Sequence, residues 1–371
     1  MRLAILGTRG IPANYGGFET FAEQLGARLV ARGHDVVVYC RPHYVPTTLK
    51  EHLGVRLVHL PTVRHKYLDT VIHAGLSAAH AMGQRYDAIL MCNAANALVC
   101  TLPRSVGTPV ALNVDGLERN RKKWNRLGRA WYRVSERLAT WVASAVVTDA
   151  RVIQHYYEDR YHCPSVFIPY GCDVGGDAGT GTLDRFGLRS GDYVLYVSRL
   201  EPENNAHAVI AGFEASGLDR RLALVGDAPY ADEYKALLRR MAGPRVVFTG
   251  GVYGEGYREL QSHAFAYVHA TEVGGTHPAL VEAMGRGNAV VVHDVPENRE
   301  VAGDAGLYFD ARTPSTLGAA LRQLDRDPAL VEALRTRAID RATALYSWEH
   351  VTDEYEALFG RLQAGHGSKV R

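Results

Sequence analysis

The 371-residue sequence has few cysteines and no long hydrophobic run. Its five cysteines are an odd number without CxxC spacing, so they fit reduced thiols better than a disulfide framework or a zinc site. The longest apolar runs are strand-sized pieces such as residues 36–40, too short to span a bilayer. The N-terminal residues enter a predicted strand at once, and we expect no secretion signal. We therefore expect a cytoplasmic protein with no transmembrane helix and no metal site.

The composition is that of a globular protein: 47% of the residues are hydrophobic and 22% are charged. This excludes disordered, collagenous and coiled-coil chains. The net charge of +2 conceals an asymmetry, because residues 1–170 carry 21 Lys and Arg against 12 Asp and Glu, and the rest of the chain is acidic. The two halves are therefore expected to face different partners, and the basic half an anionic one.

Apolar, strand-like runs alternate with helical patterns along both halves. The runs are rich in Val, Ile and Leu without strict alternation, as in strands buried on both faces. Such alternation predicts an α/β protein with two doubly wound, Rossmann-like parallel sheets. We place the domains at residues 1–170 and 171–345, with the Gly-rich segment 171–181 as a flexible connection. Ligands are expected at the carboxyl ends of the strands, in a cleft between the two domains.

Two glycine loops follow predicted strands. In the first, Gly16 and Gly17 precede a helix, and free N–H groups at a helix start attract phosphate. A tight strand-to-helix turn would have the same composition. The loop is not a GxGxxG fingerprint and lacks a P-loop Lys, which argues against an NAD-dependent dehydrogenase or an ATP site. The second pair, Gly274 and Gly275, precedes a helix predicted to begin near Pro278.

Two charged residues stand where a nucleotide would need them. Arg199 follows the first predicted strand of the second half, where a guanidinium can bind a diphosphate. The alternative is a surface Arg paired with Glu201 or Glu203. Glu282 lies one turn into the second apolar helix, where its carboxylate can accept hydrogen bonds from a ribose diol; the alternative is a solvated or capping Glu.

Taken in order, these motifs resemble a retaining GT-B glycosyltransferase of glycosyltransferase family 4. The resemblance covers nearly the whole chain and includes residues 16–17, 32–36, 168–173, 198–200 and 280–287. Residues 346–349 resemble the closing segment of that family, which implies a last helix, about 346–365, that crosses back onto the first domain. The first domain would then bind the acceptor and the second the sugar nucleotide.

The finer resemblance is to the branch that includes bacterial β-1,4-rhamnosyltransferases. It rests on residues 7–20, 114–118, 201–205 and 273–276. It implies transfer of L-rhamnose from dTDP-L-rhamnose to a saccharide, and no cofactor besides this nucleotide sugar is expected. Three positions depart from the wider family: Gly274 replaces its first Glu, Asn204 its Lys, and Asp115 its first-domain His.

The resemblance and the residues together give the candidate site. Asp115, Arg199 and Glu282 are the candidate catalytic residues, with Asp115 as a base or a positioning residue, or merely a turn residue. The leaving diphosphate would be stabilised by Arg199 and main-chain N–H groups without a metal ion. The candidate donor-binding residues are Gly16, Gly17, Arg199, Asn204, Tyr253, Gly274, Gly275, Thr276, His277 and Glu282.

Residues 118–141 combine basic side chains with aromatic ones, which suits the surface of an anionic membrane. A solvated basic helix with core aromatics is the alternative, and no nucleic-acid-binding module accompanies the segment. We expect a peripheral contact with the inner face of the plasma membrane that presents a polyprenyl-diphosphate-linked acceptor. The candidate membrane and acceptor residues are Arg119, Lys122, Lys123, Trp124, Arg126 and Arg129.

The expected function is therefore sugar transfer in cell-surface polysaccharide synthesis. Other donors, such as UDP-GlcNAc, UDP-glucose or GDP-mannose, remain open. A GT-B sugar-nucleotide epimerase would need the same donor site without an acceptor. A non-catalytic sugar-nucleotide-binding protein would bind the donor and transfer nothing.

Overall fold

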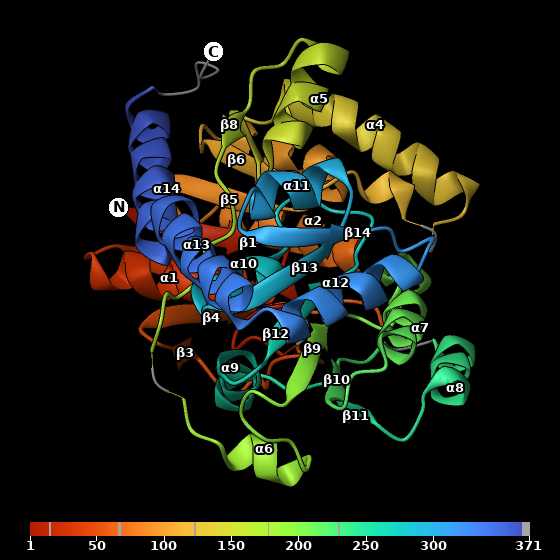
Figure 1. Ribbon diagram of the computed structural model, residues 1–371. Helices are drawn as coiled ribbons and strands as arrows, with labels where there is room; N and C mark the ends of the chain where they lie inside the picture. Colours follow the sequence, from red (N-terminus) through yellow and green to blue (C-terminus); the bar gives the residue numbers. More distant parts are fainter. Residues whose placement is uncertain (15, 66–67, 122–123, 177, 229–230, 366–371) are drawn as a thin grey trace. The chain divides into compact units, whose positions relative to one another are not determined.

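The computed structural model describes residues 1–14, 16–65, 68–121, 124–176, 178–228 and 231–365. The chain forms two compact α/β units (Figure 1). The first comprises Met1–Tyr170 together with the segment from Trp348 onward, and the second comprises Gly171–Ser347. Each unit is built on its own sheet, so each presents its own set of loops at the carboxyl ends of its strands.

The sheet of the first unit has the strand order β3-β4-β2-β1-β5-β6-β7-β8. All described pairings are parallel except that of β3 with β4, a short antiparallel hairpin that the sequence pattern did not predict. The order reverses at β1, which pairs with β2 through Leu3 and Val36 and with β5 through Leu3 and Ala88. The strands are β1 (Arg2–Leu6), β2 (Asp35–Cys40), β3 (Glu51–His52), β4 (Val55–His59), β5 (Ala88–Cys92), β6 (Val110–Asn113), β7 (Ala145–Thr148) and β8 (Val166–Phe167).

Helices cover both faces of this sheet. Successive strand residues point to opposite faces, so Leu3 and Ile5 belong to one apolar core and Ala4 and Leu6 to the other. The first core is closed by α1 and α14, and the second by α2, α4 and α5. The helices are α1 (Gly17–Ala31), α2 (Asp69–Ala81), α3 (Thr101–Ser105), α4 (Arg126–Val142), α5 (Arg151–Tyr161) and α14 (Trp348–Ala364), with 3-10 helices η1 (Ala94–Cys100) and η2 (Glu118–Asn120).

The C-terminal helix α14 packs on the first unit beside α1 (Figure 1). Its buried residues Trp348, Tyr355 and Phe359 join the same core as Phe21 of α1. At the edge, Arg32 at the end of α1 pairs with Asp353 and other carboxylates of α14. Helix α14 is therefore part of the first unit's core, although the whole second unit precedes it in the chain.

The second unit has a parallel sheet of order β11-β10-β9-β12-β13-β14. Its order reverses at β9, which pairs with β10 through Val194 and Leu222 and with β12 through Tyr196 and Val268. The strands are β9 (Tyr193–Val197), β10 (Arg221–Val225), β11 (Val246–Gly250), β12 (Ala266–His269), β13 (Ala289–His293) and β14 (Gly306–Phe309). The helices are α6 (Gly181–Arg185), α7 (Ala206–Ser216), α8 (Asp232–Met241), α9 (Gly254–Ser262), α10 (Pro278–Gly285), α11 (Pro296–Ala302), α12 (Ser315–Arg326) and α13 (Pro328–Tyr346), with η3 (Pro202–Asn204).

Two apolar cores flank this sheet as well. One joins α7 and α12 to the face that carries Val194 and Tyr196, and the other joins α10 and α13 to the face that carries Tyr193 and Leu195. Since helices cover both faces, only the strand ends are left for polar chemistry. In open sheets of this kind, ligands bind where the strand order reverses, because the loops on either side diverge there. That position lies between β9 and β12 in the second unit and between β1 and β5 in the first.

The segment 171–176 is not the flexible connection that its glycines predicted. The Cys172 N–H donates to Tyr346 O at 2.7 Å, and the Gly175 N–H donates to Gly285 O at 2.8 Å. The Arg286 side chain also donates to Gly175 O. These bonds fix this segment to the ends of α10 and α13, which its composition alone does not reveal. Within the described residues, no helix is both long enough and apolar enough to cross a membrane.

Candidate functional site

In the second unit, the loop after β9 carries Arg199. Gly226, at the end of the neighbouring β10, has φ +135°, and a Cβ there would overlap Ser198 O, so this close approach requires glycine. Ser198 donates its N–H to Val225 O at 3.1 Å, which holds the loop against β10. Arg199 is partly buried, and its side chain makes no ion pair or hydrogen bond with the described residues. The surface pairing with Glu201 or Glu203 is therefore absent there.

Asn204 has a different role from the predicted one. It is 2% exposed, and its Nδ2 donates to the Arg199 carbonyl at 2.7 Å. Its own carbonyl accepts a hydrogen bond from the Tyr196 hydroxyl at 2.6 Å. The amide thus fixes the Arg199 loop rather than reaching a ligand, which corrects its assignment as a donor-binding residue. A Lys at this position could not make the same short bond inside the loop.

The loop after β12 lies next to the Arg199 loop because β9 and β12 are paired. Asn205 joins the two loops: its Nδ2 donates to Ala270 O at 2.9 Å and to the Glu272 carboxylate at 3.0 Å. The Glu272 N–H donates to Glu203 O at 3.1 Å. Both loops are therefore held as one surface at the point where the strand order reverses.

The glycine pair in this loop offers main-chain donors. No acceptor among the described residues binds the N–H groups of Gly274 and Gly275, although Gly275 is buried. Buried N–H groups normally find a partner, so these two favour a bound anion. A Cβ on Gly274 would overlap the His277 ring as it lies here, so a larger residue at this position would require that ring to move. Thr276 is 2% exposed and lies in the same turn.

His277 lies immediately before the first residue of helix α10. Its ring packs on His269 with centroids 4.6 Å apart, and His269 lies on β12. Burial, with a smaller contribution from His293, lowers the pKa of His269 to about 3, so that ring is neutral. The N–H groups of Leu280 and Val281 both donate to His277 O. Since Pro278 has no N–H, the helix start itself has few donors left, and the preceding glycine loop is the better anion site.

Glu282 lies in the second turn of α10 and is partly buried. Its Oε2 accepts a hydrogen bond from the Tyr257 hydroxyl at 2.7 Å, and Tyr257 lies on α9. Burial raises the pKa of Glu282 to about 7; Asp173 adds to this, while the Tyr257 bond and Arg286 oppose it. The carboxylate therefore has neither a close cation nor full solvation. Such a group gains most from a ligand that donates hydrogen bonds to it.

Tyr253, the remaining donor-binding candidate of this unit, precedes α9 and is 55% exposed. Its side chain is next to Gly251, and a Cβ at Gly251 would lie 3.1 Å from the Tyr253 ring. An aromatic ring of this kind can pack against a base or a sugar. Tyr257, one turn further on, was missed by sequence reasoning, because nothing in its spacing links it to Glu282.

In the first unit, α1 begins directly after Gly16 as predicted, but its first turn already holds a carboxylate. Glu19 is 1% exposed; its Oε1 accepts the Arg9 N–H at 2.9 Å and lies 3.7 Å from the Arg9 guanidinium. A buried carboxylate beside Gly16 and Gly17 opposes the binding of a phosphate there. The second unit is therefore better suited to the diphosphate than this glycine pair.

Asp115 follows β6 and has a left-handed backbone, with φ +59°. Asn113 holds it there: the Asp115 N–H donates to Asn113 Oδ1 at 3.0 Å. The Tyr170 hydroxyl approaches Asp115 Oδ1 at 3.5 Å, and the carboxyl is partly buried. Asp is one of the residues that adopt this conformation readily, so the backbone fits a turn residue as well as one that contacts a ligand.

The residues that support Asp115 come from distant parts of the chain. Asn113 Nδ2 donates to the Tyr355 hydroxyl of α14 at 3.1 Å, so the same amide serves Tyr355 and Asp115. Burial raises the pKa of the Tyr355 and Tyr170 hydroxyls well above the usual value. Both phenols thus remain protonated donors. Sequence reasoning missed them, because only the folded chain brings residues 113 and 355 together.

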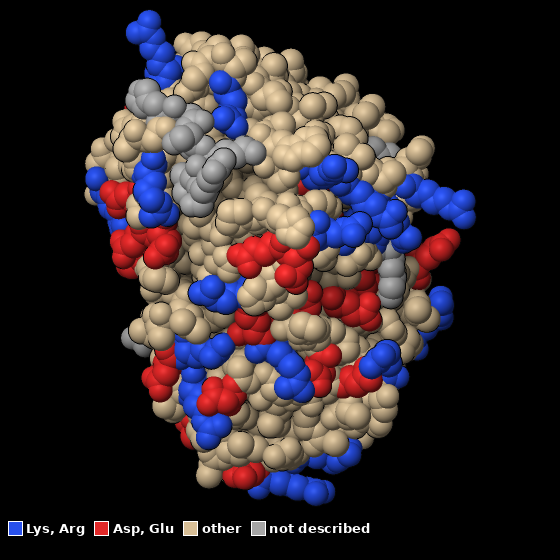
Figure 2. All heavy atoms as spheres, turned by 90° about the horizontal axis from the view of Figure 1, so that it is seen from above, with Lys and Arg blue, Asp and Glu red and all other residues tan. Residues whose placement is uncertain are grey.

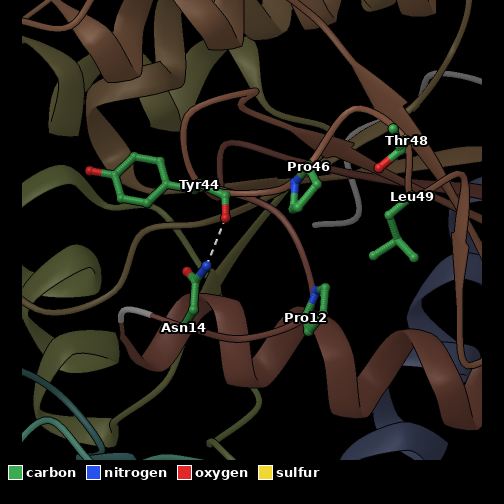
Figure 3. Close-up of a pocket in the computed structure, with 6 residues that line it drawn as sticks. All are labelled: Pro12, Asn14, Tyr44, Pro46, Thr48 and Leu49. Carbon is green, nitrogen blue, oxygen red and sulfur yellow. Dashed lines mark hydrogen bonds between the residues drawn. The ribbon is translucent and has the colours of Figure 1, made fainter.

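A pocket of about 400 Å³ lies at the carboxyl ends of β1 and β2 (Figure 3). Asn14 Nδ2 donates to Tyr44 O at 2.7 Å and so ties together the two loops that form it. Figure 3 shows Leu49 and the two prolines beside the space, with the Tyr44 ring turned away from Leu49. The pocket combines apolar walls with a few polar groups, and it is lined by Pro12, Asn14, Tyr44, Pro46, Thr48 and Leu49.

The basic segment before α4 is only partly exposed to solvent. Arg119 forms an ion pair with the buried Glu136 and stacks on Tyr156, with 4.8 Å between the guanidinium carbon and the ring centroid. Arg121 is 7% exposed and pairs with Glu118. Arg119 was therefore wrongly assigned to a membrane face. Trp124 packs on Tyr132 at 5.1 Å between ring centroids, which also places it against the protein.

Helix α4 itself does present the predicted surface. Arg126 and Arg129 are exposed, whereas Lys122 and Lys123 lie outside the described residues. Figure 2 shows Lys and Arg side chains gathered on the face of the molecule where Figure 1 places α4. Apolar side chains are exposed between them: Leu127 is 80%, Val134 52% and Trp141 57% exposed. We call the exposed residues Arg126, Leu127, Arg129, Arg133, Val134, Arg137 and Trp141 the α4 face.

Nowhere in the described ranges do three His, Cys, Asp or Glu side chains come close enough together to hold a metal ion. Burial raises the pKa of the Cys92 thiol well above its usual value, with smaller contributions from Glu19 and Asp115. Cys92 is thus a protonated core thiol beside the two carboxylates. Among the described residues, the loops at these strand ends carry carboxylates, the Arg199 guanidinium and main-chain N–H groups.

Comparison with known proteins gives two family matches. Residues 16–171 match the model "Glycosyl transferase 4-like domain", and residues 191–327 match "Glycosyl transferases group 1". The two matches fall in the first and second units respectively. Together they cover most of the chain, and the second includes Arg199 and Glu282.

Curated relatives are similar over part of their length. An O-antigen chain mannosyltransferase B of Escherichia coli is 26% identical over 46% of each chain. A phosphatidyl-myo-inositol mannosyltransferase of Mycobacterium tuberculosis is 30% identical over 56% of each chain. The chain thus matches about half the length of these relatives. Among solved structures, sucrose-phosphate synthase from Thermosynechococcus elongatus has a TM-score of 0.81 at 20% identity and covers 98% of this chain and 99% of its own, which shows a shared fold.

Proposed function

The chain belongs to the GT-B glycosyltransferases of the family 4 type, and from this we propose that it transfers a sugar, with retention, from a nucleotide sugar to a saccharide acceptor. The donor that we favour is dTDP-L-rhamnose. The acceptor that we favour is a lipid-linked saccharide used in cell-surface polysaccharide synthesis. The whole activity is a proposal, which the following features support.

One observation carries the proposal: an unpaired guanidinium and two unused N–H groups lie on adjoining loops of the second unit. Arg199 has no partner among the described residues, and neither do the N–H groups of Gly274 and Gly275. All three groups favour anions, and the paired strands β9 and β12 bring their loops together. A diphosphate satisfies all of them at once. Glu282, on the helix that follows, accepts a hydroxyl of the nucleoside's pentose.

The chemistry follows from where charge develops. Transfer breaks the bond between the anomeric carbon and a phosphate oxygen, and it forms a bond from that carbon to an acceptor oxygen. Negative charge grows on the departing diphosphate, where Arg199 and the glycine N–H groups stabilise it. In the retaining reaction, the acceptor's proton passes to the departing phosphate oxygen on the same face of the sugar. Asp115 orients the acceptor hydroxyl for this step.

The preference for L-rhamnose depends on departures from the wider family. Gly274 stands where the family has a glutamate, and the His277 ring fills the space beside it. Asp115 stands where the family has a histidine near the sugar's 6-hydroxyl. A 6-deoxy sugar needs no partner at that hydroxyl, so both changes are compatible with it. UDP-glucose, UDP-GlcNAc and GDP-mannose are the competing donors.

We assign the acceptor to the first unit. The pocket beside Leu49 offers apolar walls for the C–H face of a sugar ring, with the Asn14 amide and the Thr48 hydroxyl at its edge for hydroxyl groups. The α4 face supplies four arginines with exposed Leu127 and Trp141, a combination that suits an anionic lipid surface. The acceptor's lipid would then stay in the membrane while its sugar enters the pocket.

The deciding experiment measures transfer and donor hydrolysis with dTDP-L-rhamnose, UDP-GlcNAc, UDP-glucose and GDP-mannose, each with and without EDTA. We expect transfer from dTDP-L-rhamnose to a prenyl-diphosphate-linked saccharide, with EDTA making no difference. Conversion of a donor to a free epimer without acceptor would show an epimerase instead. Donor binding with no product from any acceptor would show a sugar-nucleotide-binding protein.

A further inference from the structure

The hydroxyl of Tyr257 has a fixed direction of donation. Gln261 Nε2 donates to the Tyr257 hydroxyl at 2.7 Å and to Ala279 O at 3.3 Å. A carbonyl can only accept, so the amide nitrogen of Gln261 must be the atom that faces both groups. The Tyr257 hydroxyl thus accepts from Gln261 and has one hydrogen of its own to give. That hydrogen goes to Glu282 Oε2, 2.7 Å away.

This network occupies one of the two oxygen atoms of Glu282. Gln261 is 1% exposed, so water does not compete for its amide. Burial raises the pKa of the Tyr257 hydroxyl well above its usual value, and the phenol therefore remains a donor. Among the described residues, no second hydrogen bond reaches the Glu282 carboxylate. Oε1 is the atom left for a ligand.

We propose that Tyr257 is a specificity-determining residue: by holding Oε2 of Glu282, it directs the carboxylate to accept one pentose hydroxyl through Oε1 rather than a diol through both oxygen atoms. The site would then bind a 2′-deoxynucleoside diphosphate sugar at least as well as its ribonucleoside counterpart. This inference rests on the proposed function, in which Glu282 binds the pentose of the donor. A ribose has two adjacent hydroxyls. The second would lose its hydrogen bonds to water without gaining a partner in the protein, and this lowers the affinity for the ribonucleotide.

The test is calorimetric binding of UDP and dUDP, which differ only in the 2′-hydroxyl. The wild-type protein should bind dUDP as tightly as UDP, or more tightly. In Tyr257→Phe, Oε2 becomes free to accept the second hydroxyl, so UDP should gain about tenfold relative to dUDP, since a hydrogen bond to a charged group is worth about that much or more.

Tyr193→Phe is the matched control. Tyr193 is also a buried phenol that binds α9, since its hydroxyl donates to Leu260 O at 2.6 Å, but it does not touch Glu282. This variant should lose a similar buried hydrogen bond and keep the wild-type ratio of the two affinities. A merely structural role for Tyr257 would leave the ratio unchanged in both variants.

Two results would overturn the inference: a wild-type protein that binds UDP tenfold more tightly than dUDP, or an unchanged ratio in Tyr257→Phe. Should that variant fail to fold, the wild-type comparison alone decides. If sugar transfer is observed and UDP is preferred, only the inference falls and the proposed function stands. If neither nucleotide binds and no donor is used, both fall.

Discussion

Replacing Glu282 by Gln should stabilise the protein at alkaline pH while it removes the acceptor for the donor's pentose. The amide oxygen of Gln can still accept the hydrogen bond from Tyr257, so the packing of α9 on α10 is kept. The substitution removes the ionisable group at position 282. The carboxylate is held in a partly buried position where its charge is poorly solvated, and the amide has no charge to solvate.

The magnitude follows from the pKa. Burial raises the pKa of Glu282 from 4.5 to about 7. Between these values the folded protein binds more protons than the unfolded chain, so stability falls as the pH rises through this window and then stays constant. Each factor of ten in the protonation constant corresponds to about 1.4 kcal/mol. Ionisation of Glu282 therefore lowers the free energy of unfolding by at most about 3 kcal/mol at pH 8 and about 1 kcal/mol at pH 5. Partial exposure of Glu282 lowers both figures.

The assay is thermal or urea unfolding of the wild type and Glu282→Gln at pH 5 and pH 8, alongside transfer activity at pH 8. We expect the variant to gain stability mainly at pH 8 and to lose most of its activity. Glu332→Gln, at an exposed carboxylate of the same unit, is the control and should change neither. A variant that is no more stable at pH 8 than at pH 5, relative to wild type, would refute the reasoning about buried charge.

Four further outcomes are expected. Arg199→Ala should cut transfer by about 2 kcal/mol in kcat/KM, the cost of a lost charge-assisted hydrogen bond, while Arg312→Ala on an exposed loop should leave kcat/KM unchanged. Asp115→Asn, which tolerates the left-handed backbone, should fold normally and lower kcat at least about tenfold with donor KM unchanged; an active variant would leave Asp115 as a turn residue. Trp141→Glu should weaken binding to phosphatidylglycerol vesicles in a sedimentation assay without changing transfer to a water-soluble acceptor. Leu49→Asp should raise the KM for the acceptor and not for the donor; equal changes in both would argue against the pocket.

The regular elements were predictable because buried parallel strands leave a strong apolar signal. The predicted runs 193–198 and 265–270, for example, contain β9 and β12, and the loops after such strands are where Arg199 and the glycine pair were expected. Strand β3 was not predicted, because a two-residue strand leaves no periodic pattern, and its antiparallel pairing with β4 was therefore missed. The bonds that fix residues 171–176 also depend on partners more than a hundred residues away.

The site was predictable only for residues that act directly on a ligand. Glu282 could be chosen from its position on an apolar helix, but Tyr257 could not, because its role depends on how α9 packs on α10. Asn204 was expected to bind the donor because it stands where the wider family has a Lys, and its burial and its bond to the Arg199 carbonyl reversed that interpretation. The assignment of Arg119 to a membrane face was wrong for the same reason. Composition shows that a residue is charged, but it does not show that a buried carboxylate pairs with it.

The position of α14 affects how the chain folds during synthesis. The core of the first unit needs Trp348, Tyr355 and Phe359, and these residues leave the ribosome only after the entire second unit has been made. Until then, the apolar face of the first sheet beside α1 is uncovered, and Asn113 lacks its bond to Tyr355. The nascent first half is therefore an incomplete intermediate that is prone to aggregate, and a chain cut before Trp348 would remain in that state.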